Sequence, residues 1–116
     1  MAAGMQAADL IVDPIMPNIS WPDAYPQVYA VIHLVRLLAG WSVFPEPMST
    51  MVGLSNLLSG QRHRFPDSLE QHCLSLLCGA GLNMALANVL RPELMSTYRM
   101  IRPMLQEEPC EEGAIA

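Results

Sequence analysis

The segment from Phe65 to Arg91 restricts the possible folds of this chain more than any other part of the sequence. Between Cys73 and Leu90 it has no charged side chain, and its most polar residues are Ser75, Asn83 and Asn88. If it is helical, at roughly 100° per residue, its leucine, methionine and valine positions fall on all sides. Such a helix has no face suited to water. We therefore expect a central helix that protein or lipid covers all round.

Sequence signals at both ends place this central helix at about residues 67–91. Asp67 and Glu70 have the spacing of a capping box, a side-chain pattern that satisfies the free N–H groups at the start of a helix. Pro92 disfavours helical geometry at Arg91, so the helix ends or bends there. At about 1.5 Å per residue such a helix is roughly 36 Å long. That length crosses either a small domain or the hydrocarbon core of a membrane.

Three further segments have the apolar periodicity of helices. Residues 27–44 have one narrow polar stripe, residues 47–60 place methionines and leucines on one face, and residues 92–105 have one apolar stripe that ends near Pro103. No stretch alternates apolar and polar residues in the way that predicts a half-buried strand. We therefore predict an all-α fold, a small bundle of about four helices around the central one.

The length of 116 residues indicates one folding unit with flanking segments. We predict an N-terminal arm at 1–26, a helical domain at 27–106 and an acidic flexible tail at 107–116. Four prolines prevent a regular helix over residues 11–26, yet this stretch has too many apolar residues for a solvated linker. The arm therefore lies either over its own helical domain or on another subunit.

Charge and residue types exclude several classes of function. The net charge is −5 and there is no lysine, so nucleic acid is not an expected partner, and Schiff-base and P-loop chemistry are excluded. Cys73 and Cys78 are five positions apart, which suits neither a shared metal ion nor a mutual disulfide. No GxSxG motif is present. We predict no catalytic residue, no cofactor and no metal site.

The cysteines also indicate the compartment. The sequence has three cysteines and no CxxC pair. An odd number of cysteines cannot all pair in disulfides within one chain, which favours a reducing environment. The first cationic side chain is Arg36, so the sequence shows no cationic leader peptide. We predict a cytoplasmic protein.

The remaining feature is an excess of apolar residues. Hydrophobic residues make up 52% of the chain and charged residues 15%, against about 25% charged in typical soluble domains. The nine methionines have flexible side chains that adapt to irregular surfaces. We predict a non-catalytic protein–protein interaction module, a small regulator or adaptor that forms a dimer and covers an apolar surface of a partner protein. The predicted partner-binding residues are Ile11, Val12, Ile15, Met16, Trp21, Met48 and Met51.

Two other functions fit the same composition. The chain could be an accessory subunit embedded in a membrane protein complex, with residues 73–90 in the bilayer, although about 18 residues is short for a span. It could also be a structural protein of a virion or of another large assembly, in which the arm contacts a neighbouring subunit.

Overall fold

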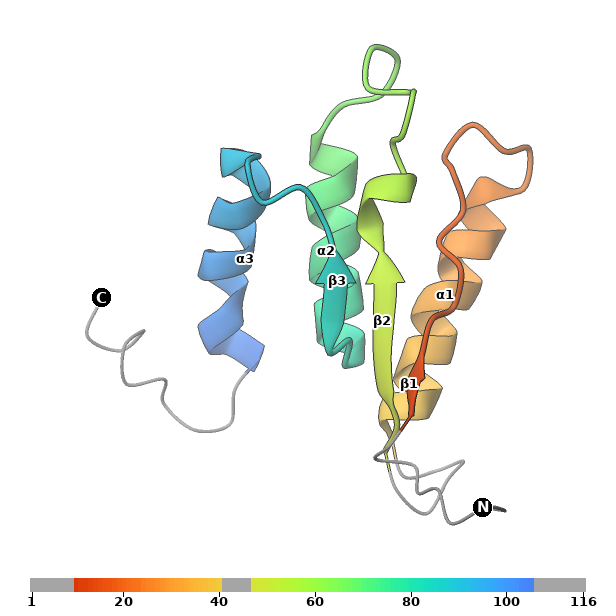
Figure 1. Cartoon of the computed structure of the whole chain (residues 1–116), viewed down its shortest axis with the longest axis vertical. Helices are drawn as coiled ribbons and strands as arrows, with labels where there is room; N and C mark the ends of the chain where they lie inside the picture. Colours follow the sequence, from red (N-terminus) through yellow and green to blue (C-terminus); the bar gives the residue numbers. More distant parts are fainter. Residues whose placement is uncertain (1–9, 41–46, 106–116) are drawn as a thin grey trace.

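The computed structural model describes residues 10–40 and 47–105 and arranges them as an α/β fold (Figure 1). A parallel three-stranded sheet with the strand order β1-β2-β3 lies beside three α-helices. The elements in chain order are β1 (Ile11–Val12), α1 (Ala24–Ala39), β2 (Ser49–Gly53), the short 3₁₀-helix η3 (Leu54–Asn56), α2 (Ser68–Ala80), β3 (Met84–Leu86) and α3 (Pro92–Leu105).

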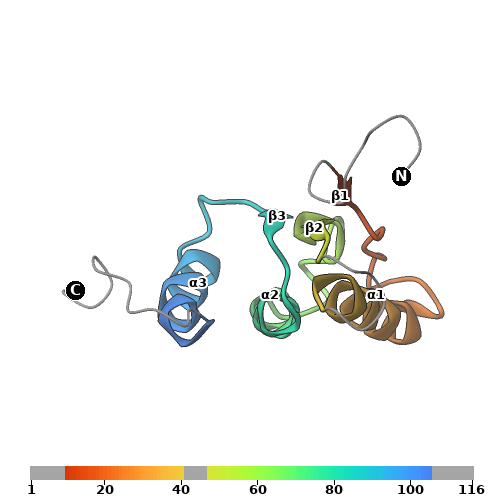
Figure 2. The same ribbon diagram turned by 90° about the horizontal axis from the view of Figure 1, so that it is seen from below.

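The molecule has two layers, with all three α-helices on one face of the sheet (Figure 2). In this view α1 and α2 lie below the sheet, whereas α3 lies beyond β3, where no described strand covers it. The opposite face of the sheet has no helix on it among the described elements. Because parallel sheets are usually covered on both faces, this bare face is an unusual feature.

The core lies between the sheet and the helices. Along β2, Thr50 and Val52 are buried, whereas Ser49, Met51 and Gly53 are half-buried, as the alternation of side chains along a strand requires. The buried positions therefore face the helices. The core consists of apolar side chains from both layers and the arm, among them Met16, Ile19, Val31, Val35, Val52, Leu54, Leu58, Leu74, Leu77 and Leu94.

The prediction of an all-α bundle is wrong, and the central helix shows why. Instead of continuing over residues 67–91, the helix α2 ends at Ala80 because Gly81 adopts a left-handed conformation with φ of 107°. The following residues form the strand β3, whose three residues pair with residues 51–53 of β2. The continuous apolar run is divided between a buried helix, an edge strand and a loop. Hydrophobic periodicity alone does not separate these elements.

The helix predicted over residues 47–60 is also absent. Ser49–Gly53 forms β2, which is the middle strand of the sheet, and only Leu54–Asn56 forms a single 3₁₀ turn. Hydrogen bonding between strands outweighs the helical spacing of the methionines and leucines here, because β2 has partners on both sides.

Two helices were predicted correctly in outline. The segment predicted at 27–44 is helical from Ala24 to Ala39, and the segment predicted at 92–105 is α3 with the same limits. The described part of the arm packs on its own domain, where Met16 and Ile19 are buried in the core. Residues 1–9, residues 41–46 and the predicted acidic tail at 107–116 lie outside the described residues.

Burial of Cys73 gives the fold a predicted dependence on alkaline pH. Burial raises the pKa of the Cys73 thiol from its ordinary value of 9.0 to about 11, and the nearby Glu70 carboxylate adds to the increase. Between these values the unfolded chain loses a proton that the folded chain keeps, so stability falls as pH rises. We expect a loss of about 2 to 3 kcal/mol between pH 9 and pH 11.

Urea unfolding at a series of alkaline pH values measures this effect. The control is Cys73→Ala, which removes the titrating thiol and should flatten the pH dependence in that interval. Equal slopes for the wild type and the variant would show that other groups cause the loss.

Candidate protein-binding surface

The strand β3 is an edge strand whose three residues are all exposed. One edge of Met84–Leu86 pairs with β2, and the other edge faces no strand among residues 10–40 and 47–105. An exposed edge presents unpaired N–H and C=O groups, which are able to pair with an added strand. The exposed fraction of Leu86 is 60% and that of Met84 is 44%, so the edge is also apolar.

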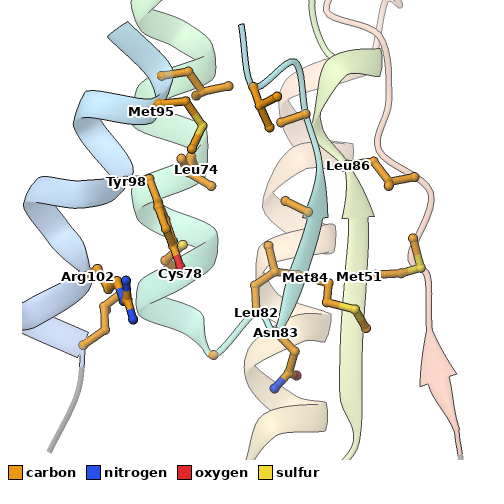
Figure 3. A pocket seen from close by; sticks show the side chains of 16 residues that line it. Met51, Leu74, Cys78, Leu82, Asn83, Met84, Leu86, Met95, Tyr98 and Arg102 are labelled. Atoms are coloured by element: carbon orange, nitrogen blue, oxygen red, sulfur yellow. The ribbon is translucent and has the colours of Figure 1, made fainter. Parts of the chain in front are cut away.

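The bare face of the sheet carries apolar side chains from two strands. Met51 pairs with Met84 across the β2–β3 register, so their side chains lie on the same face, and Leu86 follows two positions later on that face. Figure 3 shows Met51, Met84 and Leu86 close together along the two strands. Because Val52 of β2 faces the helices, the two methionines and the leucine point away from them.

A groove runs along the free edge of β3, between this strand and α3 (Figure 3). Its volume is about 640 Å³, and α2 forms its floor. Most of its lining is apolar: Met51, Leu74, Leu82, Met84, Ala85, Leu86, Ala87, Val89, Leu94, Met95 and Leu105. The remaining lining residues are Cys78, Gly81, Asn83, Tyr98 and Arg102. The groove therefore suits an extended apolar segment with a polar group at one place.

Two sets of contacts hold the walls of the groove apart. The helix α3 packs against α2, where Leu94 is buried and the Thr97 hydroxyl lies 3.5 Å from Oε1 of Gln71. The strand β3 is fixed to β2 by Asn83, whose N–H donates to the Thr50 carbonyl at 3.2 Å and whose Oδ1 accepts from the Thr50 N–H at 3.0 Å. Each wall has its own attachment, which leaves the space between them free.

The polar residues of the groove lie at the end where β3 begins. Arg102 reaches from α3 toward β3, Tyr98 lies one turn earlier on the same helix, and Asn83 precedes β3 directly (Figure 3). Within residues 10–40 and 47–105, no acidic side chain lines the groove. Because the Oδ1 atom of Asn83 is already bonded to the Thr50 N–H, its Nδ2 group is the part left for a ligand.

An ion-pair network fixes the start of α3. Arg62 donates to Asp67 at 3.1 Å and to the buried Glu70 at 2.9 Å, and Arg91 pairs with the other Asp67 oxygen at 3.1 Å. The predicted capping box is not formed, since Asp67 makes no side-chain capping hydrogen bond. The two carboxylates bind arginines instead. Because Arg91 directly precedes α3, this network helps to position one wall of the groove.

The cysteine in the groove is a weak nucleophile. Burial raises the pKa of the Cys78 thiol above its ordinary value of 9.0, so the thiol is protonated at neutral pH. A protonated thiol reacts slowly, because the thiolate is the nucleophilic form. Among the described residues, no group of three His, Cys, Asp or Glu side chains is arranged to hold a metal ion. We therefore treat Cys78 as part of the apolar lining.

The residues predicted to bind a partner are spread over several parts of the structure. Ile11 is exposed on β1 and Met51 lies on the bare face of the sheet, beside Met84. Ile15 and Trp21 are exposed on the arm, with exposed fractions of 75% and 45%, whereas Val12 and Met48 are half-buried. Met16 is 2% exposed and belongs to the core. Of the predicted set, only Met51 lines the groove.

The residues of β3 and α3 that form the groove were not among the predicted binding residues. Met84, Leu86 and Val89 were assigned to a fully covered helix, so their exposure was not expected. The signal available was Gly81, because a glycine within an apolar helical run is a frequent helix end. Read in that way, the three residues 84–86 become a separate short element.

Comparisons with known proteins do not assign this chain to a family. Protein-family models, curated proteins and solved structures give no match to this chain. Within residues 10–40 and 47–105, none of the helices has the length and apolar character needed to cross a bilayer. Residues 73–90, the segment considered for the membrane, are divided between α2, β3 and the loop after β3.

Proposed function

We propose that this chain is a non-catalytic protein–protein interaction module that binds an extended segment of a partner protein along β3. The observation that supports the proposal is the combination of an exposed edge strand with an apolar groove beside it. The partner segment adds to the sheet as a further strand, and its side chains on one face enter the groove. Its binding covers the unpaired backbone of β3 and the apolar side chains around it.

This mode of binding uses two sources of affinity. Backbone hydrogen bonds form between the partner segment and the free edge of β3, and pockets beside the strand select the side chains at alternate positions. Large apolar side chains at the centre of an interface supply most of the binding energy. Leu86 and Val89, which line the groove with exposed fractions of 60% and 68%, are placed to supply it here.

The position of α3 favours strand addition at this edge over the other. Each of α1 and α2 lies below the sheet, but α3 lies beyond β3 with no described strand above it (Figure 2). A strand added next to β3 continues the sheet over α3 and gives that helix the cover it lacks. The opposite edge is β1, which has two residues and is followed by Pro14, so it offers few hydrogen bonds to an added strand.

We keep the cytoplasm as the proposed location, because the free thiols Cys73 and Cys78 suit a reducing compartment. The mechanism we propose is occupancy. The module acts by covering a segment of its partner, and it needs no reactive group for this purpose. A homodimer remains a proposal that the same apolar surface supports, since two copies would each bury part of it.

A random peptide display library tests this function. The strongest binder selected from it is then measured by calorimetry. We expect Leu86→Glu to weaken the binding of that peptide by about tenfold or more, because the substitution places a charge in the apolar contact. The matched control is Leu76→Glu. Leu76 is 58% exposed on α2 and does not line the groove, so its variant should bind the peptide as the wild type does.

Two outcomes would contradict the proposal. Selection that yields no specific peptide indicates that the edge of β3 binds no extended segment. Equal weakening by Leu86→Glu and Leu76→Glu indicates that the peptide binds elsewhere or responds only to net charge. Circular dichroism of both variants checks that the fold is retained.

A further inference from the structure

The charge distribution in the groove limits the chemistry of the segment that fits there. Among the residues that the structure describes, Arg102 is the one charged side chain in the groove lining, and no acidic side chain accompanies it. The described residues form three ion pairs, and none of them includes Arg102. The Arg102 side chain is exposed on α3, so it is accessible to a ligand that binds in the groove. A segment without an anionic group would leave this position unmatched.

The neighbours of Arg102 are hydrogen-bond donors. The Tyr98 hydroxyl lies on the groove side of α3, and the Nδ2 group of Asn83 is left free at the start of β3 (Figure 3). The guanidinium group of Arg102 provides up to five N–H donors and no acceptor. Tyr98 and Arg102 therefore place two donor groups of α3 at one end of the groove, and among the described residues the lining contains no carboxylate to compete with a ligand for them.

The other end of the groove has a different character. Beyond Leu86 the lining continues with Ala87 and Val89, and α3 contributes Met95 to it. This end offers no charged side chain to a ligand. The groove is therefore polar at one end and apolar along the rest of its length, which gives a bound segment a defined direction.

We propose that the segment bound along β3 is an apolar extended peptide of another protein with one acidic side chain next to Arg102. This inference rests on the proposed function and specifies the partner for it. The carboxylate accepts hydrogen bonds from Arg102, and the apolar side chains that follow lie against Leu86 and Met95. A bidentate arginine–carboxylate pair fixes the register of the segment as well as contributing affinity.

Calorimetry with four synthetic peptides tests this inference. Each peptide is a hexamer with blocked ends, in which five alternating valine and threonine residues are joined to one charged residue. The charged residue is glutamate at the first or the last position in two peptides and lysine at the same positions in the other two. We expect one glutamate peptide to bind about tenfold more tightly than the lysine peptide with the same placement.

Arginine variants identify the source of this preference. Arg102→Gln should reduce the glutamate-to-lysine preference to within about twofold, because it removes the charge and retains a polar side chain. The matched control is Arg99→Gln. Arg99 is exposed on the same helix and does not line the groove, so this variant has the same net charge and should keep the preference.

Three results would overturn the inference. The first is equal binding of the glutamate and lysine peptides, the second is a preference that survives in Arg102→Gln, and the third is no binding of any of the four. Light scattering run in parallel decides whether a second copy occupies the groove, which would appear as self-association that Leu86→Glu removes. None of these results alone refutes strand binding in general, which the library selection with Leu86→Glu decides separately.

Discussion

Replacing Gly81 by alanine is expected to lower the free energy of unfolding by about 3 kcal/mol, although it adds a single methyl group. Gly81 ends α2 with φ of 107° and ψ of 20°, a left-handed conformation that costs other residues about 1 to 2 kcal/mol. An added Cβ atom would also lie 2.5 Å from the Cβ atom of Ala39 in α1, so the helices must move apart. Chemical denaturation measures the loss.

Gly60→Ala is the matched control for this prediction. Gly60 also has a positive φ, 75°, but an added Cβ atom there meets no atom within 4 Å. Its variant should lose only the conformational part, about 1 kcal/mol. Adding Ala39→Gly to Gly81→Ala should recover part of the loss, because it removes the atom that clashes. Equal losses at Gly60 and Gly81, with no recovery in the double variant, would show that helix α1 is not packed closely against Gly81.

Replacing Arg62 by methionine is expected to destabilise the fold by about 3 to 5 kcal/mol. The Glu70 side chain is 3% exposed and accepts a hydrogen bond of 2.9 Å from Arg62. Methionine keeps the length of the side chain but removes the cation, which leaves a buried carboxylate with no described cation in contact. An isolated buried charge is more costly than a pair, because the protein does not replace the hydration that the charge has lost. Thermal and urea unfolding measure this effect.

Two further variants separate the buried pair from the exposed one. Asp67 also contacts Arg62, but its side chain is 47% exposed, so Asp67→Asn should cost less than about 1 kcal/mol. The double variant Arg62→Met with Glu70→Leu removes both charges and should recover most of the stability of the wild type. If Asp67→Asn lowers the free energy of unfolding as much as Arg62→Met does, then the exposed Arg62–Asp67 pair provides the stabilisation, and our assignment of it to Glu70 is wrong.

Several elements could be predicted from the sequence because their signals are local. The helix over Pro92–Leu105 has a proline at its first position and one apolar stripe, and it forms with the expected limits. Pro14, Pro17 and Pro22 precede the first helix, as expected, but Pro26 lies in the first turn of α1, which begins at Ala24, so the prediction of no helix over residues 11–26 is wrong at its end. These features depend on the backbone of a few neighbouring residues, so distant parts of the chain do not change them.

The groove could not be predicted, since it depends on which distant segments pair. Residues 49–53 and 84–86 are each as compatible with a helix as with a strand, and they become strands because they lie next to each other and bond in register. Only after this pairing does β3 become an edge, with Met84 and Leu86 exposed beside α3. Arg102 acquires its position in the groove in the same way, from the packing of α3 on α2.

By itself, therefore, the sequence determined that the chain is rich in apolar residues, has few charges, and changes direction at particular prolines and glycines. Only the tertiary structure decided that part of the apolar run is an edge strand, and which apolar side chains are exposed instead of buried. The physical reason is that the identity of a residue sets its cost of exposure to water, whereas strand pairing and helix packing between distant segments decide whether that exposure occurs.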